Sequence, residues 1–329
     1  MRIGLFMAPQ WAPNASIDSG LAEVAALVRS ARHNGFTSLL IGQHMVLAPI
    51  RMFQPIPLLG WLAREADGML IGPGVALLSM LNPVMAAEEA ATLDWITDGN
   101  FVFAVGLGYR TEEFTVMGAK PKERVARFTE ALDVVKRLWT EERVTHHGAF
   151  FELPDVGASI RPKRQPRPPI WIGGGVDAAV RRAARLGDAW IGAPAVTVDE
   201  GVHFLGVYAG ERQRLGLAVE SCPLIRECFV GNNSAQARSV SRGPLLFKYE
   251  AYASWGQDHV AGVPLAERFD EFATDRFIVG DVHAARDELQ RYSEVLGVDH
   301  LLLRVEWPGL AHGEALKNIE RIADVVGGL

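Results

Sequence analysis

Short apolar runs alternate with amphipathic stretches along almost all of this 329-residue chain, and no other feature restricts its fold as much. Most of the apolar runs are nearly continuous, as in strands that helices cover on both faces. Strands that alternate with helices in this way build parallel sheets from βα units. We therefore predict eight strands, at residues 2–7, 38–42, 69–77, 101–106, 169–173, 188–192, 222–230 and 300–305.

The amphipathic stretches between these strands predict helices. The first, 19–34, spaces its apolar residues at helical intervals and ends before Gly35, a residue that favours helix C-termini. After the second strand, Pro55 and Pro57 indicate that any helix begins beyond them. We predict the other helices at residues 83–97, 124–139, 178–186, 198–215, 282–296 and 314–326.

Eight βα units in a chain of this length predict one domain, residues 1–329, of the α/β class. The natural closure is a (β/α)₈ TIM barrel with two insertions. Residues 146–168, before the fifth strand, are rich in Pro and Arg and predict a short hairpin or lid. Residues 231–276, after the seventh strand, predict a long loop that serves as a lid or binding element.

Composition restricts the partners and the compartment. The net charge of −6 argues against nucleic acid or an anionic membrane as the main partner. No apolar stretch is long enough to span a bilayer, and the first residues do not have the pattern of a signal peptide. Cys222 and Cys228 have the spacing of neither a redox pair nor a zinc site. We expect reduced core thiols in a cytoplasmic protein.

Several familiar catalytic motifs are missing. The chain has no GxSxG, HExxH or GxxxxGK[ST] sequence, so serine hydrolase, zincin and P-loop chemistry find no support. The adjacent histidines His146-His147 point apart, so we interpret them as a solvated turn and predict no metal site. The paired carboxylates Glu88-Glu89 and Glu112-Glu113 are interpreted as surface charge.

A run of three glycines, Gly173 to Gly175, joins the fifth predicted strand to a helix that begins near Asp177. Glycines at this position let backbone N–H groups approach an anion, and the helix dipole favours negative charge there. The alternative is a tight strand-to-helix turn with no ligand. The run is not a dinucleotide-binding fingerprint, because GxGxxG is absent.

Two more features lie at the predicted carboxyl ends of strands, the face that carries active sites in TIM barrels. Gly106 and Gly108 follow the fourth strand and leave room for a planar ring, unless they only form a turn. His44 follows the second strand, and histidine is the residue type most often used as a catalytic acid or base near neutral pH. The alternative for His44 is a structural histidine.

In this order and at these spacings, the segments resemble the bacterial-luciferase-like family of flavin-dependent monooxygenases and deazaflavin-dependent reductases. The resemblance covers nearly the whole chain. It rests on LFMAP, LLIGQHM, GPGVALLSMLNPVMAAEEAATLDWITDGNFVFAVGLGYRTEEF, ERVARFTEALDVVKRLW, IWIGGGVDAAVRRAARLGDAWI and GVDHLLLRVEWPG. The fold that the resemblance implies, a TIM barrel with insertions, agrees with the strand count.

The resemblance also implies a set of site residues. His44 would act as a base or hydrogen-bond donor near the reactive face of the flavin, although Gln43-His44-Met45 stands where many flavin monooxygenases have Glu-His-His. Trp307 would line the substrate pocket, or would only pack. The residues that would hold the cofactor are Gly173, Gly174, Gly175 and Val176 for its phosphate, and Gly74, Val75, Gly106 and Gly108 for its ring.

Two finer expectations follow from the resemblance. The Gly74–Val75 peptide is expected to be cis, as it often is in the family. Arg124 and Arg127 precede the family's glutamate, Glu130, and would place a charge near the phosphate or form a helix salt bridge; we favour the salt bridge.

The function implied is a two-component monooxygenase. It would take reduced FMN from a separate reductase and use oxygen to oxidise a small, largely apolar substrate, and we expect a homo-oligomer. A deazaflavin-dependent reductase or dehydrogenase that transfers hydride without oxygen is the first alternative. The lack of an evident basic cluster for a polyglutamate tail favours FMN. A non-catalytic flavin-binding protein is the second alternative.

Overall fold

A computed structural model of the chain describes residues 1–257 and 259–328 and contains a closed (β/α)₈ barrel, as predicted. Parallel pairing runs from β13 through β1 and β3 to β5, and from β6 through β9 to β10. Isolated bridges, such as Ile71–Phe101 and Gly192–Leu224, join the two sets, and β11 pairs with β13 to close the ring. The barrel strands are β1 (Arg2–Met7), β3 (Ser38–Ile41), β5 (Leu70–Pro73), β6 (Phe103–Val105), β9 (Ile170–Gly173), β10 (Ala189–Ile191), β11 (Leu224–Val230) and β13 (His300–Arg304).

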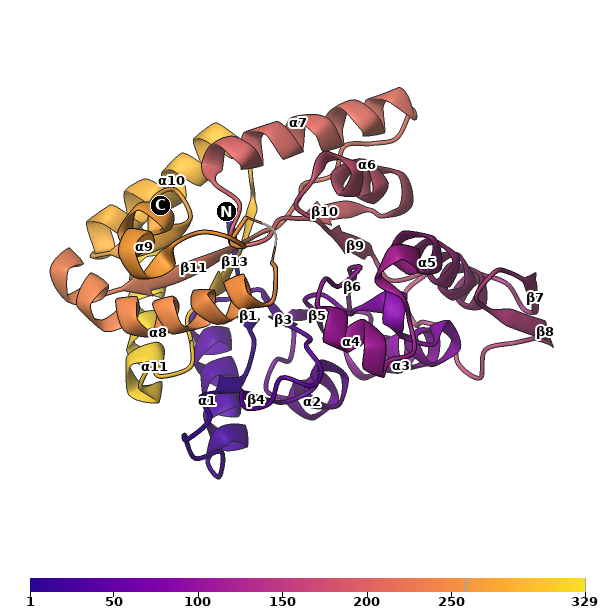
Figure 1. The fold of residues 1–329 in the computed structure, drawn as a ribbon, viewed down its shortest axis with the longest axis horizontal. Coiled ribbons are helices and arrows are strands. Elements are labelled where there is room, and N and C mark those ends of the chain that lie inside the picture. The colour runs from indigo at the N-terminus through magenta and orange to yellow at the C-terminus, as the bar shows by residue number, and fades with distance from the viewer. Residues whose placement is uncertain (258, 329) are drawn as a thin grey trace.

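Figure 1 shows the helices arranged around these strands. Side-chain caps fix several of their starts: Asn82 caps α3, Thr197 and Glu200 form a capping box on α7, and Asp281 caps α10. The covering helices are α1 (Gly20–His33), α2 (Pro55–Leu62), α3 (Pro83–Ile96), α5 (Arg124–Thr140), α6 (Asp177–Leu186), α7 (Val198–Arg214), α10 (Val282–Leu296) and α11 (His312–Val326). Among the described residues, no helix is both long and apolar enough to cross a membrane.

The start of α2 differs from the prediction. The helix begins at Pro55 and includes Pro57, instead of beginning after them. Both prolines lie in the first turn, where a backbone N–H has no partner within the helix, so their missing donors remove no hydrogen bond.

The segment 231–276 is not the long loop that we predicted. It forms two helices, α8 (Ser234–Ser254) and α9 (Leu265–Ala273), and a further strand, β12 (Phe277–Gly280), follows. The buried face of α8 includes Ser241 and Lys248, and the helix contains Pro244, so its sequence does not show a clean apolar stripe. Strand β12 pairs with the second half of β11, outside the ring of eight.

The insertion before the fifth barrel strand is the predicted hairpin, formed by β7 (Val144–His147) and β8 (Glu152–Val156). It projects at the edge of the molecule, on the right in Figure 1. Glu130 of α5 organises its turn, since its carboxylate accepts hydrogen bonds from the N–H groups of Phe150 and Phe151 and lies 3.2 Å from Nε2 of His146. The other short elements are the antiparallel pair β2 (Gln10–Trp11) and β4 (Arg51–Met52), and helix α4 (Thr111–Val116).

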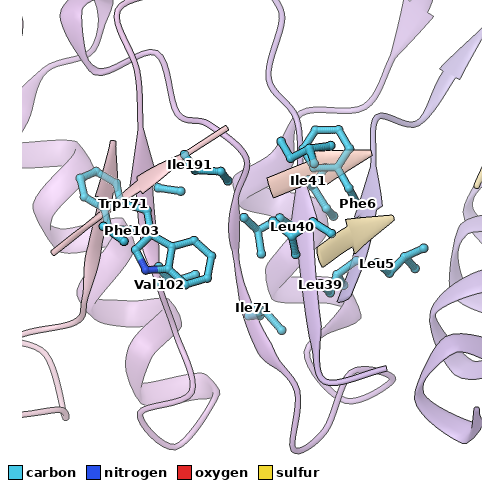
Figure 2. Packing of buried hydrophobic residues seen from close by; sticks show 14 of the residues in the cluster. Leu5, Phe6, Leu39, Leu40, Ile41, Ile71, Val102, Phe103, Trp171 and Ile191 are labelled. Atoms are coloured by element: carbon cyan, nitrogen blue, oxygen red, sulfur yellow. The ribbon is translucent and has the colours of Figure 1, made fainter. Parts of the chain in front are cut away.

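Buried apolar side chains from β1, β3, β5, β6, β9 and β10 form one continuous core inside and around the barrel, and Figure 2 shows part of it. The register sets Leu40, Phe6, Arg304 and Glu227 at one level across β3, β1, β13 and β11. Side chains at one level of neighbouring parallel strands point to the same face. A Cβ added to Gly74, which follows β5, would lie 2.9 Å from the ring of Phe6 on β1. Because β3 separates β1 from β5 in the sheet, this contact crosses the barrel interior, and the level of Phe6 faces inward. The next level of side chains, towards the carboxyl ends of the strands, lines the end of the barrel that we call its mouth.

Candidate active site

His44 lies in the loop after β3, and its ring is fixed by a residue from another loop. Its Nδ1 lies 3.0 Å from Oε1 of Glu113 on α4. The same oxygen accepts a hydrogen bond of 2.9 Å from the backbone N–H of Met45 and one of 3.3 Å from Arg110. Arg110 also donates to the carbonyl of Met45, at 2.8 Å. Glu113 and Arg110 therefore hold both the His44 ring and the backbone beside it.

The interpretation of Glu113 as surface charge is wrong, because its side chain is 0% exposed. Burial raises the pKa of Glu113, but the hydrogen bonds from His44 and Met45 and the charge of Arg110 together hold it below the ordinary value. An ionised carboxylate only accepts hydrogen bonds, so Nδ1 of His44 carries the proton that points to it. Nε2 of His44 is then the basic nitrogen.

An aromatic wall surrounds the His44 ring, formed by Tyr109 from the loop after β6 and by Tyr252 and Trp255 from the end of α8. Their ring centroids lie 5.8, 6.0 and 5.5 Å from that of His44. The guanidinium of Arg110 stacks on Trp255, 4.8 Å from its centroid. The insertion after β11 thus covers the histidine of the barrel with an apolar surface.

The predicted ring-binding residues come together at the mouth. The Gly74–Val75 peptide is cis, as expected from the resemblance. A Cβ on Gly106 would lie 2.6 Å from Cγ2 of Val75, and one on Gly173 would lie 3.4 Å from Cγ1 of the same residue. Val75 therefore projects between the ends of β6 and β9. Gly106 must lack a side chain for this arrangement.

Gly108 has a more local role. Its φ of +75° lies in the left-handed region, which favours glycine. A Cβ there would also lie 2.6 Å from Cε of Met80. Gly108 is thus required by the turn that leads to Tyr109 and Arg110, whether or not a ring lies against it.

The glycine loop after β9 leads into α6, which begins at Asp177 as predicted. The carbonyls of Gly174 and Gly175 are held from behind by Trp190 Nε1, at 2.8 Å, and by His259 Nε2, at 2.7 Å. A Cβ on Gly174 would collide with Ala179, so this glycine is also needed for close packing of α6. The tight-turn explanation therefore accounts for Gly174, and the anion-binding explanation remains a prediction.

Two acidic side chains beside this loop are each paired with a histidine. Asp177 lies 2.7 Å from Nε2 of His203, and Glu200 lies 3.0 Å from Nδ1 of His259. Arg127, one candidate for the phosphate, stacks instead on Phe151, 4.8 Å from the ring centroid. No salt bridge of Arg124 or Arg127 occurs in the described part of the chain, so our preference for a helix salt bridge is wrong.

Trp307 does not face the open mouth. It is 2% exposed and belongs to a second core with Phe229 and Tyr249, between the barrel and α8. Its indole N–H donates to Oε2 of Glu227. The packing explanation fits this position better than a wall of the substrate pocket.

Sequence reasoning missed Glu113, Tyr252 and Trp255, and the buried charges of Glu227, Lys248 and Arg304. One feature of the sequence could have indicated that Glu113 is buried. Its neighbour Phe114 is apolar and lies in the segment that follows the fourth predicted strand. Residues on α8 carried none that relates them to His44. Within residues 1–257 and 259–328, no group of three or more His, Cys, Asp or Glu side chains could hold a metal ion.

The sequence model of the luciferase-like monooxygenase family matches residues 1–300. The chain therefore belongs to this family and is an oxidoreductase, which overturns the non-catalytic alternative. It is 23% identical over 328 residues to the uncharacterised protein y4vJ of Sinorhizobium fredii, covering 95% of this chain and 92% of that one. It is 34% identical over 136 residues to an F420-dependent glucose-6-phosphate dehydrogenase of Kineococcus radiotolerans, and this match spans only 40% of each chain.

Solved structures share the whole fold. Monooxygenase RslO1 from Streptomyces bottropensis has a TM-score of 0.89 and 22% identity, covering 100% of this chain and 99% of its own. The oxygenating constituent of 3,6-diketocamphane monooxygenase from Pseudomonas putida, in complex with FMN, has a TM-score of 0.81 and 19% identity, with coverages of 98% and 96%. An F420-dependent secondary alcohol dehydrogenase has a TM-score of 0.78 and 18% identity, with coverages of 99% and 98%. A flavin-type cofactor suits both kinds of neighbour.

Proposed function

We propose that this chain is a monooxygenase that binds reduced FMN and uses dioxygen to oxidise a small, largely apolar organic substrate. The observation that carries the proposal is the position of the His44–Glu113 pair. The basic Nε2 lies beside the aromatic wall, in the loop after β3, at the same end of the barrel where Val75, Gly106 and Gly173 meet. Such a site combines one proton-transfer group with apolar surroundings.

The residues at the mouth fit a flavin in two places. Val75, with the side-chain-free Gly106 and Gly173, would lie against the ring system. The N–H groups of the Gly173–Val176 loop and the N-terminus of α6 would hold the phosphate. When bound, reduced FMN supplies the electrons that the activation of oxygen requires.

His44 and the aromatic wall have separate tasks in this proposal. Nε2 of His44 accepts a proton from the reacting groups or returns it, which is the kind of help worth about 10²–10⁴-fold in rate. Glu113 fixes the tautomer and stabilises the imidazolium when His44 is protonated. Tyr252 and Trp255 exclude water from the His44 side.

The charges beside the glycine loop favour FMN over the deazaflavin. FMN ends in a phosphate, whereas the deazaflavin coenzyme continues beyond its phosphate into a chain of carboxylates. Asp177 and Glu200 flank the loop, each beside a histidine, and neither pair presents an Arg or Lys to the carboxylates of such a tail. The phosphate of FMN needs only the loop N–H groups and the start of α6.

A second candidate function is hydride transfer to or from a deazaflavin. It is favoured by the same His44–Glu113 pair, because a carboxylate-supported imidazole can remove a hydroxyl proton while hydride leaves the adjacent carbon. It is also favoured by the partial match to F420-dependent glucose-6-phosphate dehydrogenase. In both functions the proton moves at Nε2 of His44.

For the monooxygenase, we expect a separate reductase to supply reduced FMN; the diketocamphane neighbour is itself the oxygenating constituent of its enzyme. We also expect the chain to self-associate and to work in the cytoplasm. A reductase that supports oxygen-dependent turnover when mixed with the protein at catalytic concentration would support the two-component arrangement.

Anaerobic titration with reduced FMN and, separately, with reduced deazaflavin tests the choice of cofactor. We expect reduced FMN to bind at least about tenfold more tightly, which corresponds to about 1.4 kcal/mol. Subsequent exposure to air should then oxidise the bound FMN. Tight deazaflavin binding without FMN binding would establish the second candidate instead.

A further inference from the structure

Glu306 lies just beyond the carboxyl end of β13. Arg304 and Phe6 share the interior level of the barrel, and Glu306 and Ala8 each lie two residues further on. The N–H of Ala8 donates to Oε1 of Glu306 at 3.1 Å. Glu306 is partly exposed, whereas Arg304 and Val305 before it and Trp307 after it are buried. Its carboxyl therefore reaches the mouth.

A network of buried charges lies beneath and beside this carboxyl. Glu227 on β11 pairs with Lys248 on α8 and accepts a hydrogen bond from Tyr249 at 3.0 Å. Arg304 sits at the same level of the barrel as Glu227. These side chains are almost completely buried, so Glu306 is the member of the cluster that the mouth can reach.

Arg304 does not pair with the carboxyl of Glu306. Its guanidinium donates to neutral acceptors, namely the Tyr252 hydroxyl at 3.2 Å, the Gln10 side chain at 3.3 Å, and the backbone carbonyls of Ala8 and Glu306. Within the described residues, no Lys, Arg or His nitrogen forms a salt bridge with Glu306, and Lys248 is engaged by Glu227. A largely buried carboxyl that forms no salt bridge favours its neutral, proton-carrying form.

We propose that Glu306 is a specificity-determining residue that donates a hydrogen bond from its carboxylic acid to a carbonyl or hydroxyl oxygen of the substrate. One neighbour, Tyr252, places it on the substrate side. Tyr252 connects the network to the aromatic wall, since its hydroxyl accepts from Arg304 while its ring lies 6.0 Å from His44. This inference rests on the proposed function and specifies its substrate class. The substrate would be an apolar molecule with one oxygen atom, and Glu306 would orient it towards His44.

The proton on Glu306 is available at neutral pH. Burial raises the pKa of Glu306 to about 7, although the charge of Arg304 and the Ala8 hydrogen bond act in the opposite direction. The charged groups that face it are Arg304 on β13, Glu227 on β11 and Lys248 on α8; the segment after β1 contributes the neutral Gln10 of β2. Below this pKa the acid donates, and above it the carboxylate repels the lone pairs of a substrate oxygen.

Two probes of similar shape test the proposal without any turnover. Cyclohexanone carries an acceptor oxygen, and methylenecyclohexane does not. Binding of each to the full-length protein in the presence of oxidised FMN can be measured by ligand-detected NMR. At pH 6 we expect a preference for cyclohexanone of roughly threefold to tenfold, the value of one neutral hydrogen bond. The preference should disappear at about pH 8.5.

Two variants separate the effect of hydrogen-bond donation by residue 306 from the effect of its side-chain shape. Glu306→Gln keeps a donor that does not titrate, so its preference should be the same at both pH values. Glu306→Leu should show no preference at either pH. An unchanged preference in Glu306→Leu, or a wild-type preference that does not fall as pH rises, would overturn the proposal. The wild-type result alone decides the matter if a variant does not fold.

Measuring the binding of both probes without FMN distinguishes a failure of the Glu306 proposal from a failure of the FMN proposal. If FMN does not bind but the pH-dependent preference for cyclohexanone persists, the assignment of Glu306 stands and the cofactor assignment falls. If FMN binds and no preference is found at any pH, Glu306 is only part of the network beneath the mouth.

Discussion

Nδ1 of His44 lies 3.0 Å from Oε1 of Glu113, a carboxylate with no exposure to solvent. The two residues are separated by 69 positions and come from loops after different barrel strands. A buried carboxylate behind an imidazole fixes which nitrogen is basic and stabilises the protonated ring. The site therefore depends on both residues.

Replacing His44 by Ala should remove the proton-transfer group with little effect on folding. We expect turnover to fall by at least about tenfold, since general acid–base catalysis typically contributes 10²–10⁴-fold. Product formation with reduced FMN under air measures turnover, and thermal unfolding gives the melting temperature. A fully active variant would show that Nε2 takes no part in the chemistry. A variant that unfolds early would assign His44 a structural role.

Glu113→Gln keeps an oxygen for Met45 and Arg110 but removes the negative charge. We expect turnover to fall by at least about tenfold while the fold persists, because the imidazolium loses its partner. Fluorescence-monitored denaturation checks folding at the same time. Arg137→Gln, which breaks an outer pair of α5 with Glu141, is the matched control and should leave turnover unchanged.

Glu113 should also contribute to the pH dependence of stability. Its folded pKa is lowered, so its contribution is complete above the unfolded value of 4.5 and is lost as pH falls through the folded pKa. The melting temperature of wild type minus that of Glu113→Gln should therefore shrink when pH is lowered from 6 to about 3. A constant difference would mean that the Glu113 carboxyl has the same affinity for protons in both states.

Gly106→Ala should destabilise the protein through Val75. The added Cβ would lie 2.6 Å from Cγ2 of Val75, and overpacking of this kind typically costs about 1–3 kcal/mol. Val75→Ala in the same chain should recover part of the loss, as urea unfolding can measure. Gly173→Ala is the matched comparison, because its Cβ would lie at 3.4 Å from Val75 and should be tolerated better. Equal losses without recovery would exclude the Gly106–Val75 contact as the cause.

Val176 permits a cleaner test of the phosphate site than Gly174, whose replacement would disturb α6. Val176 is the exposed N-cap residue of α6 and has extended backbone angles. Asp or Asn there should cap the helix and keep or raise stability. Only Asp adds a charge that repels phosphate, so Val176→Asp should bind reduced FMN at least about tenfold more weakly than Val176→Asn. Equal affinities for both variants would place the phosphate elsewhere.

The barrel itself was predictable, because continuous apolar runs such as those of β1 and β9 are a direct consequence of burial on both faces. His44 and the glycine loop were predictable for a related reason, since their positions follow from where strands end. The His44–Glu113 contact was not, because it joins two loops whose paths depend on tertiary packing. A two-residue pattern such as Glu112-Glu113 gives no indication of which carboxylate turns inward.

Helix α8 shows a second limit of prediction from sequence. Lys248 and Ser241 lie on its buried face and Pro244 lies inside it, so its pattern imitates a loop. Lys248 is tolerated there only because Glu227, on a distant strand, supplies its partner. A charge that is buried against another buried charge cannot be recognised from either sequence segment by itself.

The aromatic wall of His44 has a consequence for how this protein can diversify. Tyr252 and Trp255 belong to an insertion between two strands, whereas His44, Glu113 and the glycine loop belong to the barrel. The apolar cover over His44 and the His44–Glu113 pair are therefore carried by separate pieces of chain. A substitution in α8 can reshape the surface over His44 and leave its contact with Glu113 in place.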